Sequence, residues 1–209
     1  MAGQVRLVLA SASEARLRTL RNAGLDPEVI VSGVDEDSEP VDGVPELAVR
    51  LARLKAEAVS ARLDHGPGAT VVIGCDSLLE LDGVPYGKPG TPAAAVRRWQ
   101  QIRGRAGQLH TGHHVVMRRG TETTARTAVA STLVYFAQIT DHEIESYVAS
   151  MEPLHVAGGF TIDGLGGAFV TGIEGDHHNV IGLSLPLLRT MLNELGISWP
   201  SLWRIARDS

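Results

Sequence analysis

The stretch "VVIGCDSLLELDGVPYGKP" (71–89) places a carboxylate and a lysine around a predicted strand. The apolar run at 71–73 is typical of a buried strand, and Asp76 follows it at the point where the strand is expected to end. A carboxylate there needs a partner or a metal, because an unpaired buried charge is costly. Lys88 stands between a glycine and a proline, in a restricted loop that suits a fixed phosphate contact. Ligands commonly bind at strand ends in open α/β sheets, so both are candidate site residues, the alternatives being a turn-capping aspartate and an exposed loop lysine.

A second group of candidates follows the first predicted strand, at 5–10. Ser11, Ser13 and Arg16 lie where that strand passes into a helix, and the free N–H groups of a helix start favour an anion. The alternative is plain capping by Ser13 and a solvated Arg16. Neither GxxxxGK[ST] nor GxGxxG occurs in this segment, so it is neither a nucleotide P-loop nor a dinucleotide fingerprint.

An acidic run and a lysine complete the set. Glu36 lies in "VDED" (34–37), and carboxylates of this kind suit Mg²⁺, although a solvated acidic loop is the usual fate of such a run. Lys55 lies on the shoulder of the apolar stripe of a helix that begins near Pro45; its ammonium points into a cleft or extends from the edge of the core. Together, acids for a metal and cations for phosphates are what an enzyme that cleaves a nucleotide polyphosphate needs.

Alternating helices and strands early in the chain, and antiparallel strands later, must position these groups. This order predicts an α/β fold with a mixed central sheet flanked by helices. We expect one domain, 1–209, with a C-terminal tail at 197–209. The expected elements are strands at 5–10, 26–37 and 71–75, a hairpin turning at 82–83, an antiparallel pair at 110–120 and 124–139, and helices beginning at Ser13, Pro45, Thr91, Thr140 and Ser184.

Bulk composition narrows the class of protein. The net charge of −5 over 209 residues argues against a general nucleic-acid binder, but a few local cations can still hold a small anion. A single cysteine makes no internal disulfide, which favours a reducing compartment. The N-terminus lacks a long apolar core, and no apolar run approaches the roughly 18–20 residues needed to cross a bilayer. We therefore expect a cytoplasmic protein without a membrane partner.

The same segments, in order and over nearly the whole chain, resemble the Maf family of nucleoside triphosphate pyrophosphatases. The serine–x–serine loop, the acidic run, the lysine helix and the central aspartate and lysine motifs are matched by "LASASEARLRTL", "VDED", "LARLKAEAV", "GCDS" and "YGKP". Further along, the family's order continues with "HTGHHVV", "AGGFTIDGLGGAFV" and "GDHHNVIGLSLPLL". With "GCDS" and "YGKP" counted as one, these are seven motifs in order, which makes the resemblance specific.

The resemblance implies a two-lobed fold with a cleft, similar to inosine triphosphatases, and a homodimer. It implies hydrolysis of a nucleoside triphosphate between the α and β phosphates, assisted by Mg²⁺ or Mn²⁺. Glu36 and Asp76 would bind the metal or activate water, with Asp76 the usual candidate for the proton acceptor. The triphosphate would be held by Ser11, Ser13, Arg16, Lys55 and Lys88.

The chain departs from the family pattern where members select dTTP and UTP. A glutamate and an alanine follow Ser13 in place of a proline and the first arginine, and Arg16 is retained. Ser77 replaces a threonine, and Asp163 stands where a glutamine is usual; an ionised aspartate only accepts hydrogen bonds, whereas an amide also donates. Arg16, Ser77 and Asp163 are thus candidate specificity residues, and the choice of base stays open.

Two rival interpretations remain. The first is a zinc enzyme, since zinc needs three or four convergent ligands, but no HExxH is present and surface histidines are more usual. The histidines concerned are His110, His113, His114, His177 and His178. The second is a non-catalytic nucleotide-sensing or cell-division regulatory protein on the same scaffold, in which Trp199 and Trp203 mark a partner surface or simply cover the core.

Overall fold

One mixed sheet organises the molecule. The computed structural model describes residues 5–34, 43–64, 66 and 68–204. Within these ranges the strand order is β2-β1-β3-β5-β6-β7, and β4 pairs with the end of β3. β1 pairs in parallel with β2 and β3, and the other pairs are antiparallel. The strands are β1 (Arg6–Leu9), β2 (Glu28–Val29), β3 (Ala69–Leu81), β4 (Val84–Tyr86), β5 (Ala106–Arg119), β6 (Glu122–Phe136) and β7 (Val170–Glu174).

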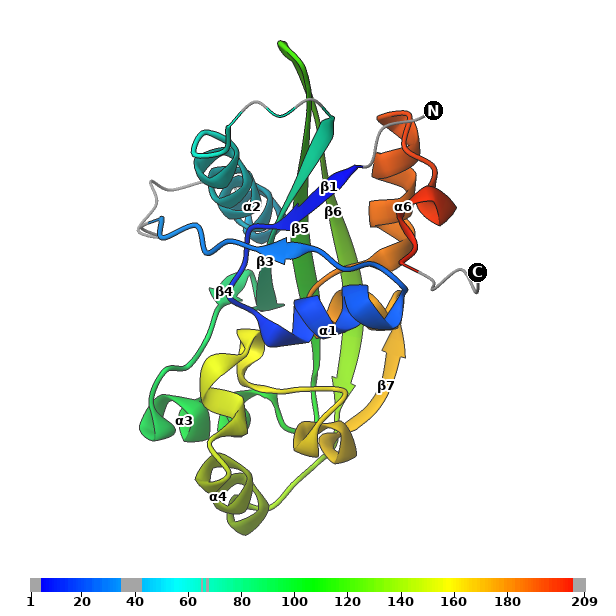
Figure 1. The fold of residues 1–209 in the computed structure, drawn as a ribbon. Coiled ribbons are helices and arrows are strands. Elements are labelled where there is room, and N and C mark those ends of the chain that lie inside the picture. Colours follow the sequence, from blue (N-terminus) through cyan, green and yellow to red (C-terminus); the bar gives the residue numbers. More distant parts are fainter. Residues whose placement is uncertain (1–4, 35–42, 65, 67, 205–209) are drawn as a thin grey trace.

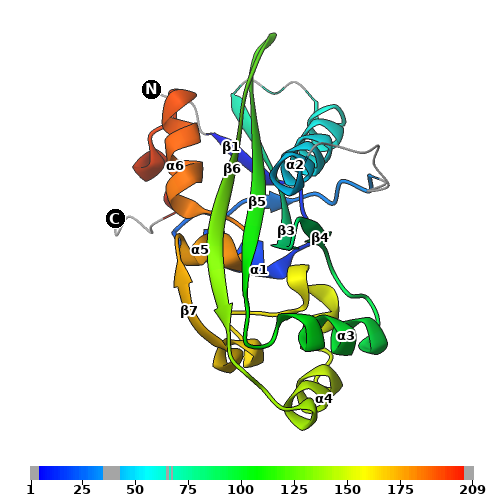
Figure 2. The ribbon, with the colours of Figure 1, turned by 180° about the vertical axis from the view of Figure 1, so that it is seen from behind.

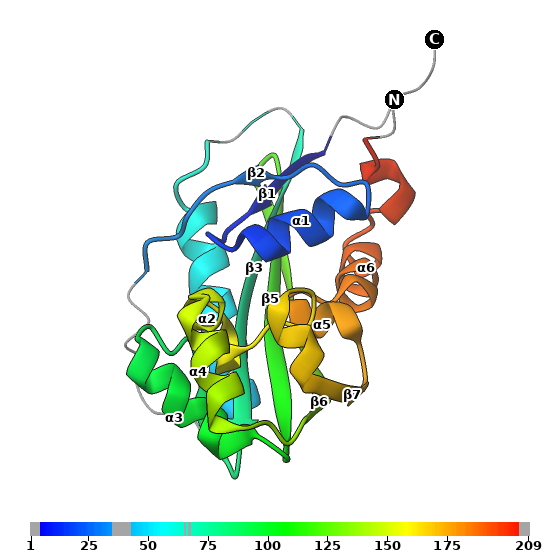
Figure 3. The same ribbon diagram turned by 90° about the horizontal axis from the view of Figure 1, so that it is seen from below.

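Helices cover both faces of this sheet (Figure 1). α2 lies across one face of β3 and β5, whereas α1 and α6 pack on the opposite face, as the view from behind also shows (Figure 2). α3 and α4 lie together at the other end of the molecule (Figure 3). The helices are α1 (Glu14–Asn22), α2 (Val44–Ser60), α3 (Pro92–Ile102), α4 (Asp141–Ala149), α5 (His177–Ile181) and α6 (Leu185–Glu194).

Of the four clusters of buried apolar side chains in the described residues, the two largest lie in separate lobes. One joins β1, β3 and β5 to α1 and α6 and includes Leu9, Leu20 and Ile73. The other surrounds Trp99 of α3, whose ring meets Phe136 edge-on at a centroid distance of 5.9 Å. The predicted mixed α/β architecture is therefore confirmed.

Local signals in the sequence placed several boundaries correctly. The Ser13 hydroxyl accepts a hydrogen bond from the Arg16 N–H at 3.4 Å and caps α1. Thr140 and Glu143 form the expected capping box at the start of α4. The turn between β3 and β4 has positive φ at Asp82, as a tight hairpin with an Asp-Gly turn requires.

Other boundaries differ from the prediction. β3 does not end before Asp76 but continues to Leu81, because β5 and then β4 pair with it beyond the point where β1 stops. The last bond from the β1 side is from the Ala10 N–H to the Ile73 carbonyl, at 2.8 Å. Asp76 therefore lies inside β3, just beyond the point where the neighbouring strand β1 ends, and not at the end of its own strand. The expected second strand is only two residues long, and the glycine-rich stretch contributes the unpredicted β7.

The segment after α6 packs back on the molecule. A 3₁₀ turn at Trp199–Leu202 follows, and Ile197 and Leu202 are 3% and 7% exposed in the same core cluster as α1. Trp199 also packs against that cluster, as the core interpretation of this aromatic residue predicts. Trp203 lies against Gly24 and stays 44% exposed.

Candidate active site

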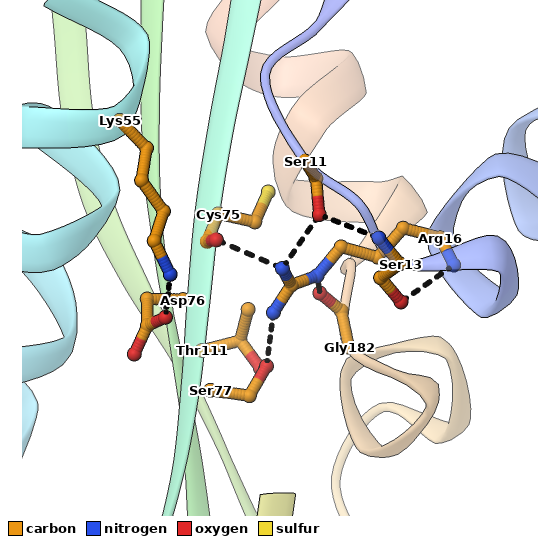
Figure 4. A network of polar contacts seen from close by, with 9 residues as sticks. All are labelled: Ser11, Ser13, Arg16, Lys55, Cys75, Asp76, Ser77, Thr111 and Gly182. Carbon is orange, nitrogen blue, oxygen red and sulfur yellow. Dashed lines mark hydrogen bonds and ion pairs between the residues drawn. The ribbon is translucent and has the colours of Figure 1, made fainter. Parts of the chain in front are cut away.

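The alternation of side chains along β3 separates the predicted site residues into two groups (Figure 4). Asp76 faces α2, whereas Cys75 and Ser77 face α1 and the loop before it. Because neighbouring side chains in a strand point to opposite faces, one carboxylate and one hydroxyl from adjacent positions serve different partners. The two groups therefore lie on opposite faces of β3 and are linked by its backbone.

On the α2 face, Lys55 and Asp76 form a buried ion pair. The Lys55 ammonium donates to Oδ1 of Asp76, and the side chains are only 11% and 10% exposed. Lys55 therefore points to the sheet and does not extend outward from the edge of the core. A buried pair of this kind holds both side chains in one geometry, because either charge alone would be costly there.

Two glycines make this pairing possible. A Cβ added to Gly74 would overlap the Ala52 carbonyl of α2, and one added to Gly112 would overlap the Ala48 carbonyl. Gly112 is the cross-strand partner of Asp76. The backbone of α2 therefore approaches the sheet directly beside the aspartate, and this close approach places Lys55 against it.

On the α1 face, Arg16 ties three parts of the chain together (Figure 4). Its guanidinium donates to the Ser11 hydroxyl at 3.1 Å, the Cys75 carbonyl at 2.9 Å and the Ser77 hydroxyl at 2.9 Å. Its Nε also donates to the Gly182 carbonyl at 2.7 Å. Arg16 is 9% exposed, so it is not the solvated side chain of the alternative interpretation. Most of the N–H donors of Arg16 are therefore hydrogen-bonded to other groups of the protein.

The Ser77 hydroxyl extends this network across the sheet. It lies 2.9 Å from the Thr111 hydroxyl, which donates to the Asn179 carbonyl at 3.2 Å. Both hydroxyls are buried. Thr111 was not singled out in the sequence, although it lies in the "HTGHH" motif, because nothing local indicates that it faces Ser77 across two paired strands.

The Cys75 side chain has a structural role here. Burial raises the pKa of its thiol to about 11, so the group stays protonated at neutral pH. A thiol in that state is a poor nucleophile, and the Cys75 residue enters the site through its carbonyl instead.

Lys88 lies in the loop between β4 and α3. Its side chain is exposed and makes no hydrogen bond or ion pair with any described residue. The loop itself is anchored at both ends, since the Gly87 carbonyl accepts from the Gly158 N–H at 3.1 Å and the Gly90 N–H donates to the Leu154 carbonyl at 2.9 Å. The lysine is thus carried on a fixed backbone with an available ammonium.

Asp163 lies beside a pocket of about 510 Å³. Its carboxylate pairs with Arg18 of α1 at 2.6 Å, and the two residues line the pocket with side chains from α1, α5 and α6. Arg18 was also missed in the sequence, because 145 residues separate it from Asp163. Ser13 and Ser11 lie at the opposite, N-terminal end of α1.

One oxygen of Asp76 suits a hard cation. Oδ1 contacts Lys55, and Oδ2 has no hydrogen-bond partner among the described residues. Carboxylate oxygens are preferred ligands of Mg²⁺ and Mn²⁺, so the residue fits a divalent ion. Glu36, the other predicted ligand, lies outside the described residues. Within the described part of the chain, no three His, Cys, Asp or Glu side chains lie close enough together to hold a metal.

The histidines of the zinc interpretation occupy separate environments. His110 bridges Glu80 and Ser131 at 2.8 and 2.7 Å on the α2 face, whereas His113 points to the other face and accepts from the Ser184 N–H. The opposite orientation of these two rings follows from the alternation of side chains along β5.

The fold and the site define a mixed α/β protein that sets a buried carboxylate beside cationic and hydroxyl groups, an arrangement suited to a phosphorylated ligand. The model of the family described as Maf-like protein matches residues 6–195, and the chain belongs to this family.

Several relatives of the chain are named nucleoside triphosphate pyrophosphatase. The chain is 56% identical to the protein of that name from Salinispora tropica, over 95% of this chain and 88% of the relative. It is 54% identical to the one from Streptomyces coelicolor, over 97% of each. Among solved structures, the Ham1 protein of Staphylococcus aureus aligns with 91% of this chain and 99% of its own, at 15% identity. Its TM-score is 0.44, at which the likeness adds nothing to the family assignment.

Proposed function

We propose that this protein hydrolyses a nucleoside triphosphate between the α and β phosphates, giving a nucleoside monophosphate and pyrophosphate. The observation that carries the proposal is the buried Lys55–Asp76 pair, which sits on the strand that also receives the Arg16 network. The name of the relatives at 50–56% identity supports the same reaction.

In this reaction Asp76 accepts the proton of the attacking water. Lys55 fixes the carboxylate, and its positive charge offsets negative charge that develops on the phosphate. Lys88, whose ammonium is exposed, holds the outer phosphates. Ser11, Ser13 and Arg16 bind phosphate at the start of α1, where the N–H groups of the helix favour an anion.

Asp76 and Glu36 would hold a divalent cation, Mg²⁺ or Mn²⁺. Such a cation would supply a lower pKa for a bound water molecule and a charge that offsets that of the phosphates. The unshared Oδ2 of Asp76 supports this assignment on the side of the site that the structure describes.

We further propose that Asp163 contributes to the choice of base, with Ser77 and Arg16 shaping the site from the other side. The pocket beside Asp163 supports this role, because an ionised carboxylate there accepts hydrogen bonds from base N–H groups. The homodimer and the cytoplasmic location stay predictions. No helix in the described residues is long and apolar enough to cross a membrane.

The test is pyrophosphate release from a panel of standard and modified nucleoside triphosphates with Mg²⁺ or Mn²⁺. We expect Asp76→Asn to lower kcat by about a hundredfold or more, since a positioned general base contributes 10²–10⁴-fold. Asp82→Asn is the matched control, because Asp82 is an exposed carboxylate in the β3–β4 turn.

If wild type releases no pyrophosphate from any member of the panel, the proposed reaction is wrong and a nucleotide-sensing role takes precedence. If Asp76→Asn and Asp82→Asn are equally active, the reaction stands but Asp76 is not the proton acceptor. The best substrate in the panel would identify the base.

A further inference from the structure

The loop that carries Lys88 rests on an arginine of α3. The guanidinium carbon of Arg98 lies 3.8 Å from the ring centroid of Tyr86, the last residue of β4. This is the geometry of a cation–π interaction, which Arg forms more often than Lys. The residue immediately before the loop is therefore packed against the charged end of Arg98.

The other side of the loop contacts the stem of the same arginine through Gly159. A Cβ added to Gly159 would meet Cγ of Pro89 at 3.0 Å and Cγ of Arg98 at 3.6 Å. Gly159 is itself fixed, because its carbonyl accepts from the Trp99 indole at 2.8 Å and its φ is +77°. Tyr86 and Pro89, on either side of Lys88 in the chain, thus both lie close to the Arg98 side chain.

The charge of Arg98 is not neutralised within the described structure. Its Nε and Nη1 atoms are shielded from solvent and have no hydrogen-bond partner there, and none of the described acidic side chains pairs with it. Burial lowers the pKa of Arg98, and the electrostatic interaction with Tyr86 opposes this shift. A half-buried charge without a counter-ion calls for an explanation, since polar groups removed from water are normally paired.

We propose that Arg98 is a positioning residue for polyphosphate binding: stacked on Tyr86, it fixes the Lys88 loop and keeps it electropositive. The inference rests on the proposed function, because Lys88 is the group that meets the phosphates. Arg98 acts through Lys88 rather than by direct contact, since two of its three guanidinium nitrogens are hidden from any ligand. An uncompensated cation beneath the loop strengthens the attraction for an anion in proportion to its charge.

The test uses inorganic tripolyphosphate as the probe, titrated calorimetrically into the full-length protein at several salt concentrations. We expect Arg98→Met to weaken binding about tenfold and to flatten the dependence of affinity on salt, because one cation near the site is lost. Arg98→Lys should recover most of the salt dependence. Arg97→Met is the matched control, with the same charge change on an exposed neighbour in α3, and should stay within about twofold of wild type.

A second variant guards against loss of folding. Tyr86→Leu removes the stacking partner without changing charge, so it should weaken tripolyphosphate binding and raise KM for the nucleotide while the salt dependence stays as in wild type. With the nucleotide as substrate, both Arg98→Met and Tyr86→Leu should raise KM more than they lower kcat, which a general loss of structure would not do.

The inference is overturned if Arg98→Met binds tripolyphosphate as tightly as Arg97→Met, or if its salt dependence equals that of wild type. If wild type and Arg97→Met bind tripolyphosphate but cleave no nucleoside triphosphate, the proposed reaction fails and the role of Arg98 in anion binding stands. If wild type cleaves nucleotide and Tyr86→Leu is unchanged in both assays, the positioning role fails and the reaction stands.

Discussion

The guanidinium of Arg16 donates to the loop before α1, to β3 and to the segment before α6. A lysine carries its three N–H donors on a single nitrogen, which cannot lie within hydrogen-bond distance of all four acceptors of Arg16. Arg16→Lys therefore leaves buried oxygens unpaired. We expect the free energy of unfolding to fall by about 2–4 kcal/mol, since each unsatisfied buried group costs about 1–3 kcal/mol. Urea denaturation followed by tryptophan fluorescence measures this loss.

Arg21→Lys on the same helix is the control for this prediction. Arg21 pairs with Asp26 at the surface at 3.3 Å, and exposed pairs contribute about 0–1 kcal/mol. If Arg16→Lys lowers the free energy of unfolding no more than Arg21→Lys does, the network contributes less to stability than its geometry indicates. The role of Arg16 would then lie in the reaction rather than in the stability of the fold.

At the scale of elements, the approach of α2 to the sheet decides whether Lys55 reaches Asp76. Gly112→Ala forces a methyl group against the Ala48 carbonyl, so α2 must move away. Overpacking costs about 1–3 kcal/mol of unfolding free energy. We expect pyrophosphate release to fall by about tenfold or more at a temperature where the variant stays folded, because the ion pair is displaced.

Gly172→Ala provides the comparison for this change. The added Cβ would meet Tyr135 of β6 at 3.9 Å, an ordinary contact in an open part of β7. Circular dichroism fixes the folded range for each variant before activity is compared. A Gly112→Ala protein that loses stability yet keeps full activity would separate the close approach of α2 from catalysis.

Local patterns could be predicted from the sequence, whereas contacts between distant segments could not. The Ser13 cap and the Asp82 hairpin turn depend on a few adjacent residues, so their patterns were readable. The contact of Lys55 with Asp76 depends on Gly74 and Gly112, which are 19 and 57 residues away and meet α2 only after the sheet forms. The sequence pattern therefore predicted the lysine but not its contact. The extension of β3 past Asp76 depends likewise on pairing with β5 and β4, which strand propensity does not contain.

At the scale of the whole molecule, His113 links the sheet to the last helix. Its Nδ1 donates to the Thr111 carbonyl at 2.9 Å, and its Nε2 accepts from the Ser184 N–H at 2.9 Å, where α6 begins. The ring is therefore neutral in the folded protein, and protonation of Nε2 would set two donors against each other. Burial lowers the pKa of His113 to about 4.

This lowered pKa makes global stability depend on pH. The unfolded chain binds a proton at His113 near pH 6.5 and the folded chain only near pH 4, so the contribution is complete above pH 6.5 and lost as the pH falls toward 4. The loss amounts to about 3 kcal/mol, at 1.36 kcal/mol per pKa unit. Urea denaturation between pH 4.5 and 7 should show a smaller pH dependence for His113→Gln than for wild type. The control is His142→Gln, at an exposed position of α4, and its stability should depend on pH as that of wild type does. If all three proteins show equal pH dependence, carboxylates alone account for the loss of stability in acid.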